Sequence, residues 1–164
     1  MTKIYKLFLP LFLLLTPLLA SDKSYSFIGI QTGASKIDKN YTPSIGLKYG
    51  IQKDNARTSL IYSYDKKSNK KLQMLLLQVD MGIFNNAFKN SYLKPYLGAT
   101  FGVLEEKRAK LTRDRGYVYG LNTGLAYILN GDFDIDLGYR YLKTSKLKNI
   151  DEINNLNLSM HYFY

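Results

Sequence analysis

Residues 133–143 read FDIDLGYRYLK and alternate between two kinds of side chain. One set is apolar or aromatic, and it consists of Phe133, Ile135, Leu137, Tyr139 and Tyr141. The other set is charged or small until its last member, and it consists of Asp134, Asp136, Gly138, Arg140 and Leu142. Successive side chains of a β-strand point to opposite faces, so this period of two predicts a strand with one apolar and one polar face.

Seven further segments show the same period. They are residues 25–35, 44–52, 57–64, 72–84, 94–105, 116–129 and 153–164. Each is close to the roughly 9 to 11 residues that a tilted membrane-spanning strand requires. Beyond residue 20, no apolar run approaches the length of a transmembrane helix.

The polar face of these segments is rich in Gly, Ser, Asn and paired charges. In residues 44–52, for example, Ser44, Gly46 and Gly50 alternate with the apolar side chains. Small residues suit a narrow lumen, and eight strands leave an interior just wide enough for side chains to fill. The sequence therefore predicts an all-β fold, an eight-stranded antiparallel up-and-down transmembrane β-barrel with its apolar face toward lipid. A soluble periplasmic lipocalin-like barrel is the alternative, and it would hold apolar side chains around an internal ligand cavity.

The connections are expected to alternate in character. Residues 53–56, 85–93 and 130–132 form mostly short or compact turns, whereas 65–71, 106–115 and 144–152 form polar, mostly basic loops. Outer-membrane barrels place short turns in the periplasm and longer loops outside, so the basic loops are predicted to be external. Two aromatic girdles follow from this topology. The outer one contains Tyr62, Tyr64, Tyr117, Tyr119, Tyr139 and Tyr141, and the periplasmic one Tyr127, Phe133, Tyr162 and Tyr164.

The N-terminus predicts export. Residues 1–20 combine Lys3 and Lys6 with an apolar run and Ala20, which is typical of a cleaved signal peptide, although a single anchoring helix is the alternative. Residues 21–164 would then form the barrel, and the barrel would be the whole mature protein. Loss of the two lysines leaves 21 basic and 13 acidic residues, a formal charge of +8 that favours an anionic surface as partner. Without cysteine the chain can carry neither a lipoprotein anchor nor a disulfide.

The C-terminus has a spaced pattern of a polar residue, a small residue, an apolar residue and a terminal aromatic residue, at Asn157, Ser159, Tyr162 and Tyr164. Over essentially the whole mature chain, and most specifically at this pattern, the sequence resembles the small eight-stranded barrels of Gram-negative outer membranes, the OmpX-like and OmpA transmembrane-domain group. In that group the last strand carries an insertion signal for the barrel-assembly machinery at these positions. Ser stands where Gly is usual in the group, and Tyr where Phe is commonest. The resemblance implies the outer membrane of a Gram-negative bacterium, contact with the barrel-assembly machinery during insertion, and a monomer.

Charged residues on the inward face are expected to form a polar network. Its predicted members are Lys48, Arg57, Asp80, Asp134, Asp136, Arg140 and His161. Hairpin register is expected to place Arg57 beside Asp80, and His161 beside Asp136. Charges in a narrow barrel must be paired and hydrogen-bonded, so the network is expected to fill and specify the barrel. A narrow gated pore, in which these pairs rearrange, is an alternative.

Catalytic, cofactor and metal sites are expected to be absent. The single histidine, His161, shares a face with Ser159, and Asp136 could orient its ring as in a hydrolase. Residues two apart on a strand are nonetheless about 7 Å apart, and this pair would face the lumen at the periplasmic end. An outer-membrane lipid-modifying enzyme is therefore the weakest alternative. One histidine and no cysteine make no convincing metal set.

The remaining candidate is the external surface. Its predicted basic residues are Lys66, Lys67, Lys70, Lys71, Lys107, Arg108, Lys110, Arg113, Arg115, Lys146 and Lys148. Clustered cations bind phosphates and sulfated glycans. We expect an integral outer-membrane barrel with a structural or surface-interaction role, whose basic loops contact lipopolysaccharide or host and environmental polyanions. No nucleic acid is expected as partner, because exported proteins rarely meet it.

Overall fold

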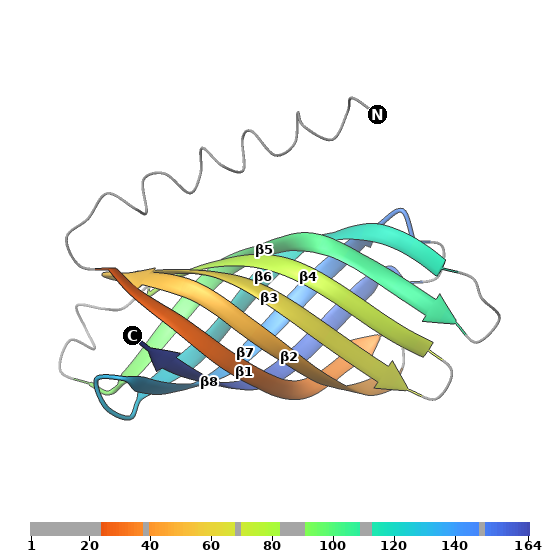
Figure 1. The fold of residues 1–164 in the computed structure, drawn as a ribbon. Coiled ribbons are helices and arrows are strands. Elements are labelled where there is room, and N and C mark those ends of the chain that lie inside the picture. Colours follow the sequence, from red (N-terminus) through yellow and green to blue (C-terminus); the bar gives the residue numbers. More distant parts are fainter. Residues whose placement is uncertain (1–23, 38–39, 68–69, 83–90, 109–112, 148–149) are drawn as a thin grey trace.

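The computed structural model describes residues 24–37, 40–67, 70–82, 91–108, 113–147 and 150–164. Eight strands form one closed barrel in which each strand pairs antiparallel with the next and β8 pairs with β1 (Figure 1). The strands are β1 (Ser24–Ile37), β2 (Asn40–Lys53), β3 (Ala56–Lys67), β4 (Lys70–Met81), β5 (Leu93–Arg108), β6 (Arg113–Ile128), β7 (Phe133–Ser145) and β8 (Glu152–Phe163). The predicted fold class is confirmed.

The two ends of the barrel differ. Residues 54–55, 82–92 and 129–132 connect strands at the end that also holds Tyr164, here called the terminal end. At the opposite end, here called the basic end, only residues 38–39, 68–69, 109–112 and 146–151 separate the strands. The expectation of short turns at the terminal end and long basic loops opposite was therefore wrong: the longest connection lies at the terminal end. Much of what was predicted as loop in 65–71 and 106–115 is strand, because interstrand pairing continues after the apolar alternation stops.

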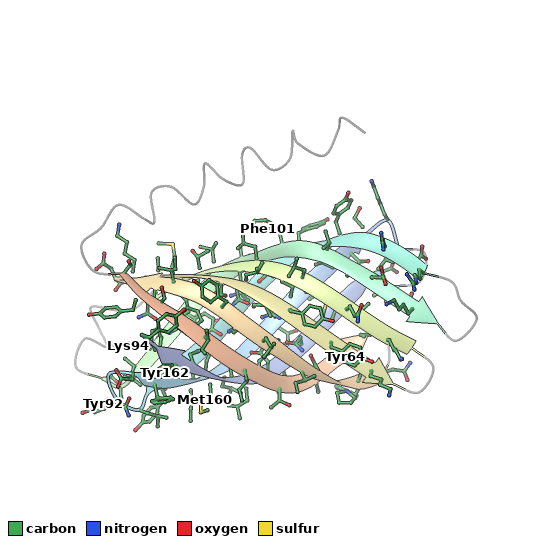
Figure 2. All side chains as sticks on the ribbon, in the orientation of Figure 1. Tyr64, Tyr92, Lys94, Phe101, Met160 and Tyr162 are labelled. Carbon is green, nitrogen blue, oxygen red and sulfur yellow. The ribbon has the colours of Figure 1, made fainter. Side chains whose placement is uncertain are left out.

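Apolar side chains cover the outside of the barrel. In β2, the side chain of Leu47 is 61% exposed, whereas that of its neighbour Lys48 is 3% exposed and points inward. Figure 2 shows the same outward placement for Phe101 on β5 and Met160 on β8. A soluble barrel would bury such residues, and a continuous exposed apolar surface of this extent indicates contact with lipid. The predicted assignment of faces is confirmed, and the outside is unlike that of a lipocalin-like barrel.

Aromatic side chains mark both ends of this surface. Tyr64 lies toward the basic end, whereas Tyr92 and Tyr162 lie at the terminal end (Figure 2). Near the terminal end, the ring of Tyr162 packs 5.0 Å from that of Phe133 and 6.4 Å from that of Tyr164. Tyrosine, with an apolar ring and a hydroxyl, suits the boundary between hydrocarbon and water.

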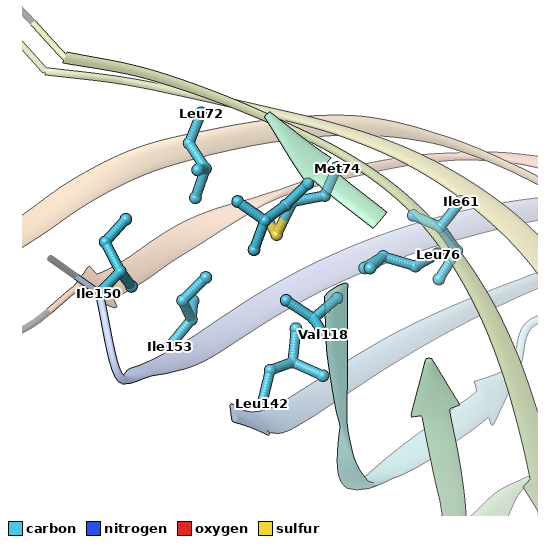
Figure 3. Packing of buried hydrophobic residues seen from close by; sticks show 9 residues of the cluster. Ile61, Leu72, Met74, Leu76, Val118, Leu142, Ile150 and Ile153 are labelled. Atoms are coloured by element: carbon cyan, nitrogen blue, oxygen red, sulfur yellow. The ribbon is translucent and has the colours of Figure 1, made fainter. Parts of the chain in front are cut away.

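The interior of the basic half contains an apolar cluster, which the sequence analysis did not anticipate. Its buried members come from β3 to β8 and from the connection before β8 (Figure 3). They are Ile61, Leu72, Met74, Leu76, Leu104, Val118, Leu142, Ile150 and Ile153. Inward serines of β1 to β3 lie beside the cluster, where the hydroxyls of Ser44 and Ser63 are 3.2 Å apart. The lumen is therefore not polar throughout.

Inward glycines make room for large side chains in the terminal half. A Cβ on Gly124 or Gly138 would lie 2.4 or 2.7 Å from the hydroxyl oxygen of Tyr96. Tyr96 thus crosses two glycines and donates a hydrogen bond to Asp136, 2.8 Å away. Among the described residues, no helix has the length and apolar character needed to cross a membrane.

A barrel with every strand paired should resist detergent until heated. We expect the folded protein, extracted from membranes, to migrate differently in electrophoresis with and without boiling, because the closed hydrogen-bonded sheet must open as a unit. Identical migration of the boiled and unboiled samples would contradict a closed barrel. A preparation unfolded in urea before loading provides the position of the open chain.

Candidate functional site

Asp134 is the centre of the buried network in the terminal half. Its Oδ2 accepts a hydrogen bond from Nη2 of Arg57 at 2.5 Å, and its Oδ1 lies 2.6 Å from Nδ1 of His161. The expected pairing of His161 with Asp136 is wrong: the register places His161 opposite Asp134, and Asp136 opposite Ser159. This difference of two residues leaves every side chain on its predicted face.

Arg57 lies opposite Asp80 in the register, as expected, but its guanidinium extends elsewhere. It donates to Oε1 of Gln52 at 2.6 and 3.0 Å and lies 3.8 Å from Oδ2 of Asp136. Its guanidinium carbon is also 5.2 and 5.4 Å from the ring centroids of Phe27 and Phe163. Arg57 is therefore held by carboxylates, an amide and aromatic rings together, and the sequence pointed only to the first of these.

The remaining predicted network residues face the same lumen. Lys48 lies 3.8 Å from Asp136, and Arg140 donates to Oε1 of Gln78 at 2.6 Å. Gln78 in turn donates to Asp80, which also accepts a hydrogen bond from Asn122. Gln78 and Asn122 were missed, although Gln78 lies two residues before the predicted Asp80 on the same face of β4, and Asn122 pairs with the predicted Arg140. All seven predicted residues are thus inward, in two groups centred on Asp134 with Asp136 and on Gln78.

A cavity of about 400 Å³ opens at the terminal end beside this network, between Tyr25, Arg57, Lys94 and Phe163. Buried side chains lie between it and the basic end, including those of Gln78, which is 1% exposed, and the apolar cluster. The arrangement fits a filled interior better than a conducting one.

Ser159 and His161 are not arranged as a nucleophile and base. The Ser159 hydroxyl donates to Oδ1 of Asn157 at 3.3 Å, and Nδ1 of His161 contacts Asp134. Both residues are buried inside the barrel, at 2% and 0% exposure. Among the residues that the structure describes, no three His, Cys, Asp or Glu side chains are placed to hold a metal ion.

The basic residues of the other end form an ordered surface on strands. On the outward faces of β3 to β6, the register aligns Lys66, Lys71, Lys107 and Arg113 directly opposite one another, and we call these four the basic row. Neighbouring strands are about 4.8 Å apart. The basic row therefore presents four positive charges across adjacent strands. Because this alignment depends on strand register, it does not follow from a prediction that places these residues in loops.

Two further rows lie beneath the basic row on the same face. The first contains Tyr64, Gln73, Glu105 and Arg115, and the second contains Tyr62, Leu75, Val103 and Tyr117. The surface thus passes from cationic through mixed to apolar and aromatic within three rows. This order matches the change from water through lipid headgroups to hydrocarbon.

Glu105 is the acidic member of this surface. Its carboxylate lies 2.8 Å from Nε of Arg115 and 3.1 Å from Nζ of Lys107. Both cations contact the same carboxylate, and charge-assisted contacts of this kind are among the stronger hydrogen bonds in proteins. Glu105 therefore occupies part of the binding capacity of both Arg115 and Lys107.

Not every predicted external residue can be placed. Lys110 and Lys148 lie outside the described residues, as do the predicted signal peptide at residues 1–20 and the side chains of Lys67, Lys70 and Arg108. Lys66, Lys71, Lys107, Arg113 and Arg115 lie on strands rather than in loops, which corrects the expectation. Lys146 follows β7 in a connection, with φ of 70°, and its Nζ lies 5.1 Å from the centroid of the Tyr117 ring.

The residues that resemble an insertion signal divide between the two faces of β8 and its end. Asn157 and Ser159 are buried in the lumen, at 4% and 2% exposure, whereas Tyr162 and Tyr164 point outward. The backbone N–H of Tyr164 donates to the carbonyl of Ser26 at 2.9 Å, beside the closing pair of β8 and β1. The last strand, β8, therefore closes the barrel against β1.

Comparison with known proteins identifies the fold. No family model and no curated protein matches the sequence. Among solved structures, Neisserial surface protein A has a TM-score of 0.69 at 19% identity, covering 86% of this chain and 97% of that one. Outer membrane protein H (OprH) of P. aeruginosa has a TM-score of 0.59 at 21% identity, covering 85% and 99%.

The outer membrane enzyme PagL is also similar, with a TM-score of 0.50 at 14% identity, covering 83% of this chain and 98% of that one. Because an enzyme shares the architecture, the fold alone does not decide whether the chain catalyses a reaction. At these identities the comparisons establish the architecture only. The chain has the fold of the small eight-stranded outer-membrane β-barrels.

Proposed function

We propose that the protein is an integral outer-membrane barrel whose basic end binds polyanions at the cell surface, above all the phosphates of lipopolysaccharide. The basic row supports this proposal most directly. Like charges directly opposite one another on adjacent strands destabilise a sheet. Lys66, Lys71, Lys107 and Arg113 nevertheless stand side by side. Anions supplied from outside the chain would relieve this repulsion and hold the row in register.

We also propose an orientation of the barrel in the membrane and a route of export. Residues 1–20 serve as a cleaved signal peptide, the terminal end faces the periplasm, and the basic end faces outward. The barrel-assembly machinery inserts the chain, with the outward Tyr162 and Tyr164 as part of its signal. The protein acts as a monomer. The closed sheet supports the monomer, because it leaves no strand edge for pairing with another chain. The role of the protein is structural or one of surface interaction.

Two other functions are less well supported. A gated pore would need the apolar cluster to part as well as the ion pairs to rearrange. An enzyme would need an accessible nucleophile and base, whereas Ser159 and His161 are buried with other partners. We therefore propose a non-enzymatic, non-conducting barrel.

Neutralising the centre of the basic row tests the proposed function. In Lys71→Gln/Lys107→Gln, we expect affinity for lipopolysaccharide to fall about tenfold or more, the equivalent of one lost charge-assisted contact. We also expect the variant to be at least as stable as wild type in neutral detergent, because the repulsion within the row is reduced. Binding to immobilised lipopolysaccharide and thermal unfolding measure the two effects.

The matched control is Lys36→Gln/Lys143→Gln, which removes the same charge. Its register partners include no basic residue: Tyr41 and Asn154 lie beside Lys36, and Tyr119 and Glu152 beside Lys143. Equal loss of binding in both double variants would mean that only net charge matters. Unchanged binding in both would refute the proposed function.

A further inference from the structure

A surface crevice lies just below the basic row, on the outward faces of β4, β5 and β6. It has a volume of about 450 Å³. Tyr62 and Tyr117 stand at its two sides, and the register places the shorter Leu75 and Val103 next to each other between them. Two large rings thus flank two smaller apolar side chains. The result is a shallow apolar groove on the outer surface of the barrel, which faces lipid.

The upper edge of the crevice is cationic. Arg115 lies one row above Tyr117 on β6, and its side chain is 75% exposed. Lys146 reaches the crevice from the connection after β7, with its Nζ 5.1 Å from the centroid of the Tyr117 ring. The two cations belong to separate segments that meet here. Guanidinium and ammonium groups are the usual protein ligands of phosphate.

We propose that this crevice binds an acylated, phosphate-bearing glycolipid of the outer leaflet, an inference that rests on the proposed function. One acyl chain lies over Leu75 and Val103 between the two tyrosines, and a phosphate lies between Arg115 and Lys146. A soluble polyanion would leave the apolar floor unused. A lipid without phosphate would leave the cations at the edge without a partner in the ligand.

The charge of the surface indicates that the ligand carries more than one anionic group. Arg115, Lys146 and the four residues of the basic row carry six positive charges. Glu105, which also lines the crevice, contributes one negative charge. A single phosphate between Arg115 and Lys146 adds no anion to the basic row above, in which Lys107 already contacts Glu105. A second phosphate on the same saccharide would reach it. The preferred ligand is therefore a saccharide with at least two phosphates.

Replacement of Glu105 tests the proposal, because it is expected to raise the affinity for the glycolipid rather than lower it. Its carboxylate competes with the ligand phosphate for Arg115 and Lys107, which lie 2.8 and 3.1 Å away. In Glu105→Gln we expect binding of the glycolipid to become several-fold tighter, because both cations lose their internal acceptor. If Glu105 served only to stabilise the fold, its replacement would leave affinity unchanged or lower it.

The main experiment uses the full barrel in detergent micelles and counts bound lipid by native mass spectrometry. The probes are bis-phosphorylated lipid A, the same lipid without its phosphates, and the de-acylated bis-phosphorylated disaccharide. Val103→Trp fills the floor of the crevice without changing charge, and Leu156→Trp, at an outward position of β8 that is 54% exposed, is its control. Arg115→Gln/Lys146→Gln removes the cations of the edge, and Lys36→Gln/Lys143→Gln is the matched control.

We expect wild type and both controls to retain bis-phosphorylated lipid A, and neither of the other probes to bind comparably. Val103→Trp and Arg115→Gln/Lys146→Gln should each lower its retention about tenfold or more. If Val103→Trp binds like wild type while Lys71→Gln/Lys107→Gln loses binding, the proposed function stands and the crevice is not the site. If no variant alters binding, both are wrong. Equal binding of the de-acylated disaccharide would also overturn the acyl-chain site.

Discussion

Asp134→Ala is expected to lower the free energy of unfolding by about 3–5 kcal/mol, the usual effect of removing one partner from a buried ion pair. The carboxylate holds Arg57 of β3, which reaches it across the lumen, at 2.5 Å, and His161 of the neighbouring strand β8 at 2.6 Å. After its removal, the remaining carboxylate partner of Arg57 among the described residues is the more distant Asp136, at 3.8 Å. Denaturant titration of the barrel in lipid vesicles, followed by circular dichroism, measures the change.

The control for Asp134→Ala is Asp132→Ala, two residues earlier in the same hairpin. Asp132 is exposed in the turn before β7, and the hydrogen bond that it accepts from Phe163 involves its backbone carbonyl. This variant should unfold within about 0.5 kcal/mol of wild type. A loss below about 1 kcal/mol in Asp134→Ala would show that the network contributes little and that the rest of the lumen holds the barrel together.

Truncation of the apolar cluster is expected to have the second largest effect. Leu76→Ala and Leu142→Ala each remove a side chain that is at most 1% exposed, so each should lower the free energy of unfolding by about 2–5 kcal/mol. The same change at Leu47, which faces outward, should have a much smaller effect, because no buried cavity is created.

Electrical measurement of the same proteins tests the closed interior. Wild type and both single variants should show no stable channels in planar bilayers, since the buried groups around Gln78 still fill the lumen below the cluster. Regular conductance steps in wild type would contradict this and would favour a polar path past the serines of β1 to β3. Steps that appear only in the variants would identify the cluster as the barrier.

The sequence predicted the faces of the strands well, and register less well, for a physical reason. Alternation fixes which side chains point inward, but a slip of two residues leaves every face unchanged. The β7–β8 hairpin shows this. In the connection between β7 and β8, Lys146 adopts φ of 70° and Ile150 is buried. This connection sets the register of the hairpin, which pairs His161 with Asp134 rather than with Asp136. Neither feature follows from a pattern of apolar and polar residues.

The sequence did not predict which side chains of β4 point inward, nor how far the strands extend at the basic end, and the two failures have different causes. Residues 74–77 are apolar on both faces, so that the buried Met74 and Leu76 resemble the outward Leu75. Beyond the hydrocarbon both faces are wet, and a strand can continue there without alternation. The segments that hold the basic row therefore resemble loops, and their alignment emerges only from the pairing of β3 to β6.

Strand pairing at the basic end also affects how readily proteases can cleave this surface. Lysine and arginine are frequent there, and loops with such residues are preferred sites of cleavage. The backbones of Lys66, Lys71, Lys107 and Arg113 instead belong to paired strands of the closed sheet. A protease must free several residues of backbone before it can bind them, and here that means breaking the sheet itself. The four residues of the basic row can therefore present their charges to the surroundings while their own peptide bonds stay protected from cleavage.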